Sequence, residues 1–199
     1  MPESPKQWYD RAIAEGYRTL PFDDWTTWPF TGELTPKQLD PPVETEPLRR
    51  GSGGAGCQCA APVEDWRGAL WTDDAWVLTG PQRASLPFAL FLVPVRHSDL
   101  AGLTPAEAVR QGELLTLIER VAIEVLPVPR IQALRWGDGG EHLHWWLLAR
   151  PTGMLQLRGT FLADWDELLP LRPAAEVRAD AEVFARRLVE VAGGRVLGT

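Results

Sequence analysis

Apolar positions follow strand-like and helix-like periods along most of the second half of the chain. Short apolar runs at residues 75–79 and 88–95 predict two strands, and a run at 156–161 predicts another. The runs at 131–136 and 142–149 flank the turn Gly137-Asp138-Gly139-Gly140, which predicts a hairpin. These segments therefore predict a set of strands that pair with their neighbours.

Two helices are expected among these strands. Thr104-Pro105-Ala106-Glu107 is a capping box with proline at the first helical position, and Pro127 ends the helix that it opens. A second helix is expected at 174–192, closed by Gly193. The apolar faces that these periods predict are Val109, Leu114, Leu117, Ile118 and Val121 in the first helix, and Val177, Ala181, Phe184, Leu188 and Val191 in the second. Without βαβ spacing, strands grouped around two helices predict an α+β domain with an antiparallel sheet and flanking helices.

The first 50 residues lack a sustained period. Their aromatic residues stand among prolines and acidic residues: Trp8, Tyr9, Tyr17, Phe22, Trp25, Trp28 and Phe30. Because so many aromatic side chains do not stay solvated, we expect an ordered, irregular arm packed on the domain or on a partner subunit. The glycine-rich segment 47–56 is typical of a mobile linker. We therefore divide the chain into an N-terminal arm (1–50), a central domain (51–170) and a C-terminal helix packed on it (171–199).

The composition excludes several classes of function. With 45% hydrophobic residues the chain can bury a core, and a net charge of −7 disfavours binding to duplex nucleic acid. No segment approaches the roughly 20 apolar residues of a membrane helix, and the N-terminus lacks the apolar stretch of a signal peptide. These features predict a cytoplasmic protein that does not enter membranes.

Candidate chemistry is concentrated in three histidines and two cysteines. His142 and His144 lie on one face of the expected strand, and two imidazoles on an otherwise apolar strand need partners. This favours a site over a pair of satisfied core histidines. Cys57 and Cys59 are too close in sequence for an ordinary disulfide. Their spacing alone leaves a shared metal and two buried thiols as alternatives.

The order of these residues resembles one known superfamily. The stretch His142-Leu143-His144-Trp145-Trp146-Leu147-Leu148 is similar to the His-φ-His-φ-His-φ-φ signature (φ apolar) of the histidine-triad (HIT) superfamily, with tryptophan in place of the third histidine. Upstream, Phe91-Leu92-Val93-Pro94-Val95-Arg96-His97 resembles the family's strand ending in Pro-x-Arg-His. Cys57-x-Cys59 stands where many members carry Cys-x-x-Cys. The resemblance spans residues 55–165 and implies a HIT-like fold for the central domain.

Resemblance to the zinc-bearing members, which include galactose-1-phosphate uridylyltransferase, implies specific roles. A structural zinc ion would be bound by Cys57, Cys59, His97 and His142, a closed Cys₂His₂ set. His144 would be the nucleophile that attacks the α-phosphorus of a nucleotide and forms a nucleotidyl-histidine intermediate. The turn at Asp138, Gly139 and Gly140 can offer N–H groups to the phosphate, or it is only a turn. Likewise, Arg135 either approaches a phosphate or is solvated.

Trp146 is the main departure from the family pattern. Tryptophan offers one indole N–H and cannot act as an acid at neutral pH. Either the leaving group needs no proton and Trp146 stacks on the substrate, or catalysis has been lost.

The resemblance therefore predicts a nucleotidyl hydrolase or nucleotidyltransferase acting on a nucleotide or nucleotide conjugate. One alternative is an inactive, zinc-stabilised module that binds a nucleotide or a protein. A second alternative is a metalloenzyme in which all three histidines share a catalytic metal. HIT proteins are often dimers, which makes a homodimer one option for this chain.

Overall fold

The computed structural model describes residues 4–15, 26–32, 37–73, 75–80 and 84–198. In this part of the chain, six strands form one sheet in the order β4-β5-β3-β2-β1-β6, and every pairing is antiparallel. The strands are β1 (Ala69–Thr72), β2 (Trp76–Thr79), β3 (Phe88–Pro94), β4 (Gln132–Leu134), β5 (Trp145–Ala149) and β6 (Arg195–Val196). The predicted α+β class with an antiparallel sheet is confirmed, as is the hairpin that joins β4 and β5.

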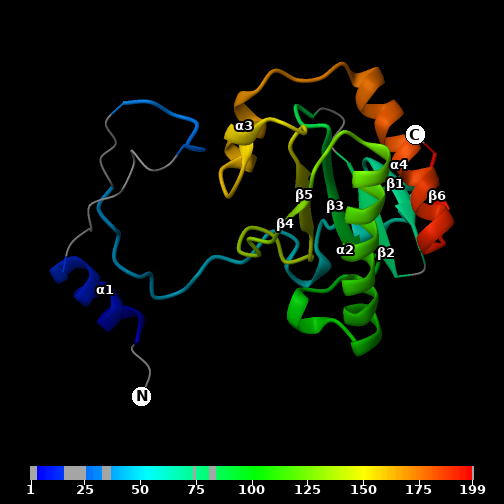
Figure 1. Ribbon diagram of the computed structural model, residues 1–199. Coiled ribbons are helices and arrows are strands. Elements are labelled where there is room, and N and C mark those ends of the chain that lie inside the picture. The colour runs from blue at the N-terminus through cyan, green and yellow to red at the C-terminus, as the bar shows by residue number, and fades with distance from the viewer. Residues whose placement is uncertain (1–3, 16–25, 33–36, 74, 81–83, 199) are drawn as a thin grey trace.

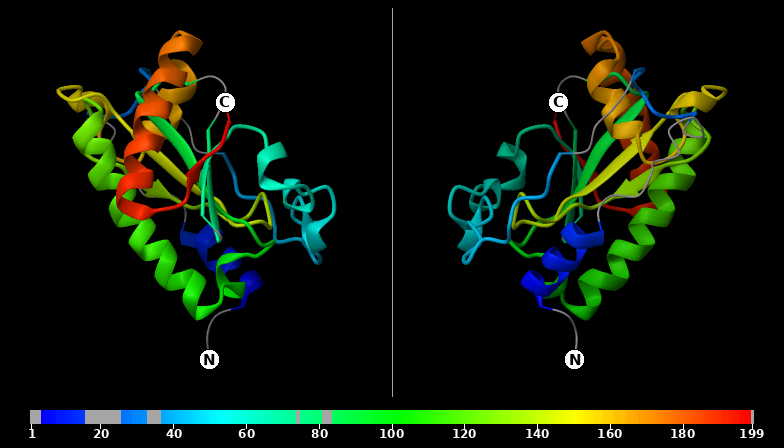
Figure 2. Two further views of the ribbon diagram at one scale, coloured as in Figure 1. Left: turned by 90° about the vertical axis from the view of Figure 1, so that its right-hand side faces the viewer. Right: turned by 90° about the vertical axis from the view of Figure 1, so that its left-hand side faces the viewer.

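Two long helices cover one face of this sheet, as Figure 2 shows. They are α2 (Pro105–Val125) and α4 (Ala174–Ala192). The capping box that opens α2 has both of its hydrogen bonds, between Thr104 and Glu107. Apolar side chains of β3, such as Leu92, pack against Ile118 of α2 and Phe184 of α4 in the main core. This packing removes large apolar surfaces from water and stabilises the two layers.

The other face of the sheet is covered only at its margins. On one side lie the short 3₁₀ turns η2 (Ser52–Gly54), η3 (Gln58–Ala60) and η4 (Val63–Asp65), followed by the buried Trp66. On the other side, η6 (Leu155–Leu157) and α3 (Leu162–Leu168) bury apolar side chains against Leu148 of β5. One more 3₁₀ turn, η5 (Leu100–Gly102), precedes α2. The middle of this face is left open for a site.

Several predictions about the strands and the core differ from the structure. The strand expected at 156–161 is wrong, because these residues form η6 and a turn that direct Leu157 and Leu162 into the second face of the sheet. Val109 was expected in the core but is 64% exposed, since the first turns of α2 extend beyond the sheet (Figure 1). Val191 near the end of α4 is 39% exposed, while its neighbours Val189 and Ala192 pack against the core.

The segment predicted as a mobile linker is folded from Arg49 onward. Arg50 forms a bridge with Gly140: its N–H donates to the Gly139 carbonyl, and its carbonyl accepts from the Glu141 N–H. Gly53 N–H donates to the Glu141 carboxylate at 2.6 Å. The glycines of this segment do form turns, but these turns are held in place by partners distant in sequence.

The N-terminal arm includes one helix, α1 (Pro5–Glu15), which lies apart from the sheet in Figure 1. A later part of the arm does contact the domain: the rings of Trp28 and Phe161 are 4.6 Å apart, and Trp165 Nε1 donates to the Thr27 carbonyl. The arm's aromatic residues Tyr17, Phe22 and Trp25 lie outside the described residues. None of the described helices is long and apolar enough to cross a membrane.

Alanine substitutions at two glycines are expected to change the stability of the fold in opposite directions. Gly68 has φ +72°, and a Cβ there would lie 2.1 Å from the Gly80 carbonyl oxygen. We expect Gly68→Ala to lower the free energy of unfolding by about 2 kcal/mol or more, because backbone must move. Gly112 in α2 has open space around it. Gly112→Ala should raise stability by about 0.5–1 kcal/mol. Urea denaturation measures both, and equal effects would contradict this view of the sheet.

Candidate metal centre and adjoining pocket

Four side chains from three separate segments meet beside the open face of the sheet. Cys57 Sγ lies 2.9 Å from Cys59 Sγ and 3.0 Å from His142 Nδ1, and Cys59 Sγ lies 3.4 Å from His97 Nδ1. All four donor atoms lie within 4.8 Å of one another. Because zinc binds sulfur at about 2.3 Å and nitrogen at about 2.0–2.1 Å, donors this close can share one ion.

Hydrogen bonds on the far side of each imidazole fix its orientation. His142 Nε2 is 2.9 Å from the Pro94 carbonyl oxygen and donates to it, so that the Nδ1 lone pair faces the cysteines. His97 Nε2 lies 3.5 Å from a carboxylate oxygen of Glu141. A histidine that ligates a metal commonly has such a carbonyl or carboxylate partner on its other nitrogen.

The proton equilibria of the cluster also suit a metal. Burial lowers the pKa of His142, which keeps the ring neutral as a ligand must be. Burial and the adjacent Cys57 thiol raise the pKa of Cys59 to about 11. A divalent cation therefore has to displace the proton of this thiol, which it can do because coordination stabilises the thiolate.

The donor set therefore forms a closed Cys₂His₂ site for a structural zinc ion, as predicted. The one-residue separation of the two cysteines does not prevent this, because Cys57 precedes η3 and Cys59 lies within that turn. His144 is not part of the cluster that the described residues form. The alternative of three histidines around one catalytic metal therefore does not fit.

His144 has a different environment. Its Nδ1 lies 2.9 Å from the backbone carbonyl oxygen of His142 and donates to it. The bond fixes the proton on Nδ1 and leaves the Nε2 lone pair free. Residues 142–144 precede β5, so the strand begins three residues later than predicted, and Leu143 N–H donates instead to the Ser98 carbonyl.

A pocket of about 720 Å³ adjoins His144 on the open face. Its floor includes Phe91 and Val93 of β3 and Thr79 of β2. The residues that complete its lining are Arg50, Gly51, Gly56, Cys57, Gln58, Arg67, Gly80, Gly140 and His142. Neither of the two arginines was predicted, because no local pattern marks an arginine that reaches a site through the tertiary fold.

The residues of the predicted phosphate turn lie at different positions around this pocket. Gly140 lines it, and a Cβ there would lie 3.4 Å from His144 Cε1. Asp138 and Gly139 are not among the lining residues. The backbone N–H groups of all three have no acceptor within the described part of the chain.

Trp146 packs in an aromatic cluster beside the pocket. Its ring centroid is 4.6 Å from that of Phe91, 5.3 Å from that of Trp136 and 6.4 Å from that of His144. Phe91 lines the pocket, whereas Trp136 is 54% exposed. Trp146 of β5 pairs directly with Phe91 of β3, which lines the pocket. Trp146 therefore forms part of the wall behind the pocket.

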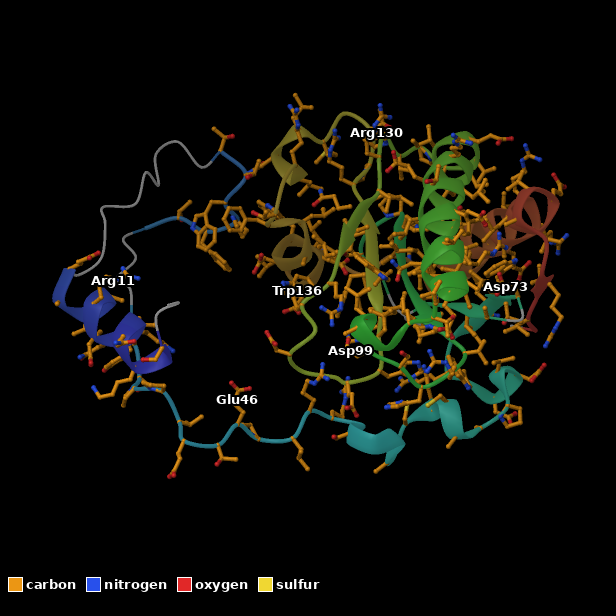
Figure 3. All side chains as sticks on the ribbon, turned by 90° about the horizontal axis from the view of Figure 1, so that it is seen from below. Arg11, Glu46, Asp73, Asp99, Arg130 and Trp136 are labelled. Carbon is orange, nitrogen blue, oxygen red and sulfur yellow. The ribbon has the colours of Figure 1, made fainter. Side chains whose placement is uncertain are left out.

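An ion-pair network holds the loops at this end of the sheet. Asp99 accepts from Arg49 Nη1 at 2.7 Å and from Arg135 Nη2 at 2.5 Å, and Arg49 also donates to the Gly137 carbonyl. Figure 3 labels Asp99 together with Trp136, the residue that follows Arg135 in the chain. Arg135 is thus neither solvated nor directed at a phosphate. It stabilises the turn that precedes His142.

Comparison with known proteins gives structural matches only. No protein-family model matches the chain, and no curated protein sequence matches it. A histidine-triad nucleotide-binding protein from Sulfolobus tokodaii matches with a TM-score of 0.50 and 10% identity, over 68% of this chain and 95% of its own. A histidine-triad protein from Bradyrhizobium japonicum matches with a TM-score of 0.50 and 18% identity, over 59% and 87%. The chain has the histidine-triad fold. A zinc-bound histidine-triad protein from Mycobacterium smegmatis also matches, at 17% identity and a TM-score of 0.49, over 66% and 94%.

The metal centre can be tested by metal content. We expect about one zinc ion per chain in the purified protein and none in Cys59→Ser, because three ligands do not make a closed structural site. Glu141→Gln should keep the ion but weaken its binding by about 10- to 100-fold, since it removes a partner of His97. Elemental analysis and competition with a chelator measure the two effects. Stoichiometric zinc in Cys59→Ser would contradict the assignment.

The network around Asp99 predicts a loss of stability in acid. Burial acts to raise the pKa of Asp99, but hydrogen bonds from Arg49, the Leu100 N–H and Arg135 lower it to about 2. Its stabilisation is complete above the unfolded pKa of about 3.9 and is lost as the pH falls through 2. We expect Asp99→Asn to cost about 2 kcal/mol at pH 7 and less at pH 2. Denaturation at both pH values checks this, and an equal cost at both would contradict it.

Proposed function

We propose that the chain is a nucleotide-binding protein of the histidine-triad type, a nucleotidyl hydrolase or nucleotidyltransferase that acts through a covalent nucleotidyl-His144 intermediate. The observation that carries the proposal is the hydrogen bond from His144 Nδ1 to the His142 carbonyl, beside a pocket of about 720 Å³. A neutral imidazole with one nitrogen held in this way has a free lone pair on the other. The Sulfolobus protein with the same fold is described as nucleotide-binding, which supports a nucleotide as the ligand.

The proposed reaction has two steps. The Nε2 lone pair of His144 forms a bond to the α-phosphorus, and the bond from phosphorus to the leaving group breaks, with its electron pair going to the leaving group. The ring becomes cationic, and the His142 carbonyl dipole stabilises the Nδ1 proton. Water or an acceptor hydroxyl then bonds to phosphorus, loses its proton, and returns the electron pair to Nε2.

Backbone donors would stabilise the charge that develops on phosphorus. The N–H groups of Asp138, Gly139 and Gly140 have no acceptor within the described residues, and Gly140 lies against the His144 ring. We propose that these N–H groups contact the phosphate, as free N–H groups in successive turn residues do at other anion sites. Zinc, when bound, has a structural role: it holds His142, whose carbonyl orients the nucleophile.

A second candidate function is a catalytically inactive, zinc-stabilised module that binds a nucleotide or a protein. The observation that favours it is the position of Trp146, which fills the place of the third histidine and packs against Phe91 and Trp136. In this case the pocket would bind a nucleotide or a protein segment without turnover. Binding would then stabilise the protein and would not depend on the His144 ring nitrogens.

Three further expectations remain predictions. They are a cytoplasmic location, the absence of binding to duplex nucleic acid, and a homodimer as one option for assembly. The division of the chain into an arm, a central domain and a C-terminal helix, at residues 50 and 170, is also a prediction. Each needs an experiment on the full chain in solution.

The two candidates predict different results for one substitution. With a panel of nucleotide anhydrides and phosphoramidates, wild-type protein should form an acid-labile nucleotidyl adduct that intact-protein mass spectrometry detects. His144→Ala should form no adduct, and turnover should fall by more than about a thousand-fold. Its zinc content should not change, because His144 is outside the metal cluster. An adduct in His144→Ala, or stabilisation by nucleotides without turnover in wild type, would favour the second candidate.

A further inference from the structure

The charge of the pocket beside His144 differs from that of the whole protein. The chain has 27 acidic and 20 basic residues, yet the pocket lining includes Arg50 and Arg67 and no aspartate or glutamate. Within the described residues neither guanidinium has a hydrogen bond or an ion pair, whereas Arg49 and Arg135 nearby both bind Asp99. A concave site with unpaired cations and no carboxylate favours an anionic ligand.

Arg50 lies at the His144 end of this pocket. The Arg50 Nη2 atom is 4.0 Å from the position of a Cβ on Gly140, and His144 Cε1 is 3.4 Å from the same position. The bridge to Gly140 fixes the backbone from which this side chain extends. Arg50 can therefore reach a phosphate that is in contact with the His144 ring.

Arg67 lies toward the other end of the pocket, beside β1 and β2. Thr79 pairs with Phe91 of β3, and Phe91 pairs with Trp146 of β5, so the end of β2 is two strand spacings, about 10 Å, from β5. Arg67 immediately precedes Gly68, whose backbone touches Gly80 next to Thr79. A single phosphate at His144 is too short to span this distance. A second phosphate, on the leaving group, would extend the anionic part of the ligand toward Arg67.

Thr79 adds an uncharged polar group to the lining at that end of the pocket. The residue is 5% exposed, lines the pocket, and lies on the pocket face because it pairs directly with Phe91. Its hydroxyl makes no hydrogen bond within the described residues. Among the described residues, the fully buried side-chain polar atoms without a partner are Trp76 Nε1 and Arg135 Nε, so the Thr79 hydroxyl is instead accessible from the pocket and can form a hydrogen bond with a ligand oxygen.

Trp146, at the position of the third triad histidine, is compatible with a phosphate as the leaving group. An amine leaves phosphorus only with an added proton, whereas a phosphate leaves as an anion at neutral pH. Trp146 cannot supply a proton to a leaving group near His144. Arg67 can instead stabilise the negative charge of a departing phosphate.

We infer that Arg50 and Arg67, together with the Thr79 hydroxyl, form a two-ended anion subsite that selects nucleotide anhydrides over nucleotide phosphoramidates. The inference rests on the proposed function of His144. Arg50 binds the phosphate that His144 attacks. Arg67 and Thr79 bind the phosphate that leaves, which takes the electron pair of the broken P–O bond and needs no proton.

The test compares two arginines. Arg67→Gln removes the charge at the far end of the pocket, and Arg120→Gln removes a charge from an exposed arginine on α2, outside the pocket lining and without an ion pair among the described residues. The probes are diadenosine triphosphate and adenosine 5′-phosphoramidate, with their guanosine, uridine and cytidine counterparts. We expect Arg67→Gln to lower kcat/KM for the anhydride by about 10- to 100-fold, through loss of a charge-assisted hydrogen bond. Its kcat/KM for the phosphoramidate and both values for Arg120→Gln should not change.

A binding measurement separates this inference from the proposed function. Calorimetry with inorganic pyrophosphate should show weaker binding to Arg67→Gln and Thr79→Val than to wild type and Arg120→Gln. Pyrophosphate binding that depends on Arg67, with no turnover of any probe, supports the subsite and overturns the proposed function. Turnover of the anhydride that is equal in Arg67→Gln and Arg120→Gln overturns the subsite and leaves the function standing. Absence of both turnover and pyrophosphate binding overturns both.

Discussion

The geometry of the whole site depends on His142, which takes part in two structures at once. Its ring faces Cys57 through Nδ1 and donates to the Pro94 carbonyl through Nε2, while its own carbonyl accepts from His144 Nδ1. A change in the position of this one residue therefore alters both the metal centre and the orientation of the candidate nucleophile. In the proposed function, the metal centre and the nucleophile are therefore coupled through the backbone of His142, although His144 is outside the metal cluster.

The hydrogen bonds of His142 form only if the neighbouring loops are held in place. Ion pairs between residues distant in sequence hold them. Asp99 holds Arg49 from the end of the arm and Arg135 from the turn before His142. Glu141 accepts from Gly53 and lies near His97, which links the same turn to the cysteine segment. The bonds of Asp99 are partly shielded from water, where a charge-assisted hydrogen bond is stronger than on the open surface, whereas the bond between Gly53 and Glu141 is exposed. The segment that the sequence marks as flexible is therefore fixed by charge.

Local patterns predicted much of the fold, and the family resemblance predicted the metal ligands. The period of α4, the capping box of α2 and the hairpin of β4 and β5 depend on neighbours a few residues apart, so the sequence contains their causes. The resemblance to the triad motif brought together four ligands that lie up to 85 residues apart. The strand predicted at 156–161 was wrong, because Leu157 and the following Leu162 pack against β5 from a turn and a short helix. A short apolar run does not distinguish a strand from a turn that covers a sheet.

The arginines of the pocket could not be predicted in this way. Arg50 follows an exposed segment of the arm and Arg67 follows a buried tryptophan, and neither has a spacing that marks it as functional. What distinguishes them from the paired Arg49 and Arg135 is the absence of a carboxylate partner, and only the tertiary structure reveals that absence among the described residues.

The same reasoning connects Trp146 to the rest of the pocket. In the histidine-triad motif that the sequence resembles, Trp146 stands in place of a proton donor, and a donor lost at a charged transition state commonly costs about 3–4 kcal/mol. Two positive charges in the pocket offset such a loss only for a leaving group that departs as an anion, because an arginine stabilises negative charge but does not release a proton at neutral pH. Trp146 and the unpaired arginines therefore restrict the chemistry in the same direction. Their combination, rather than either feature alone, favours an anhydride as the ligand of this pocket.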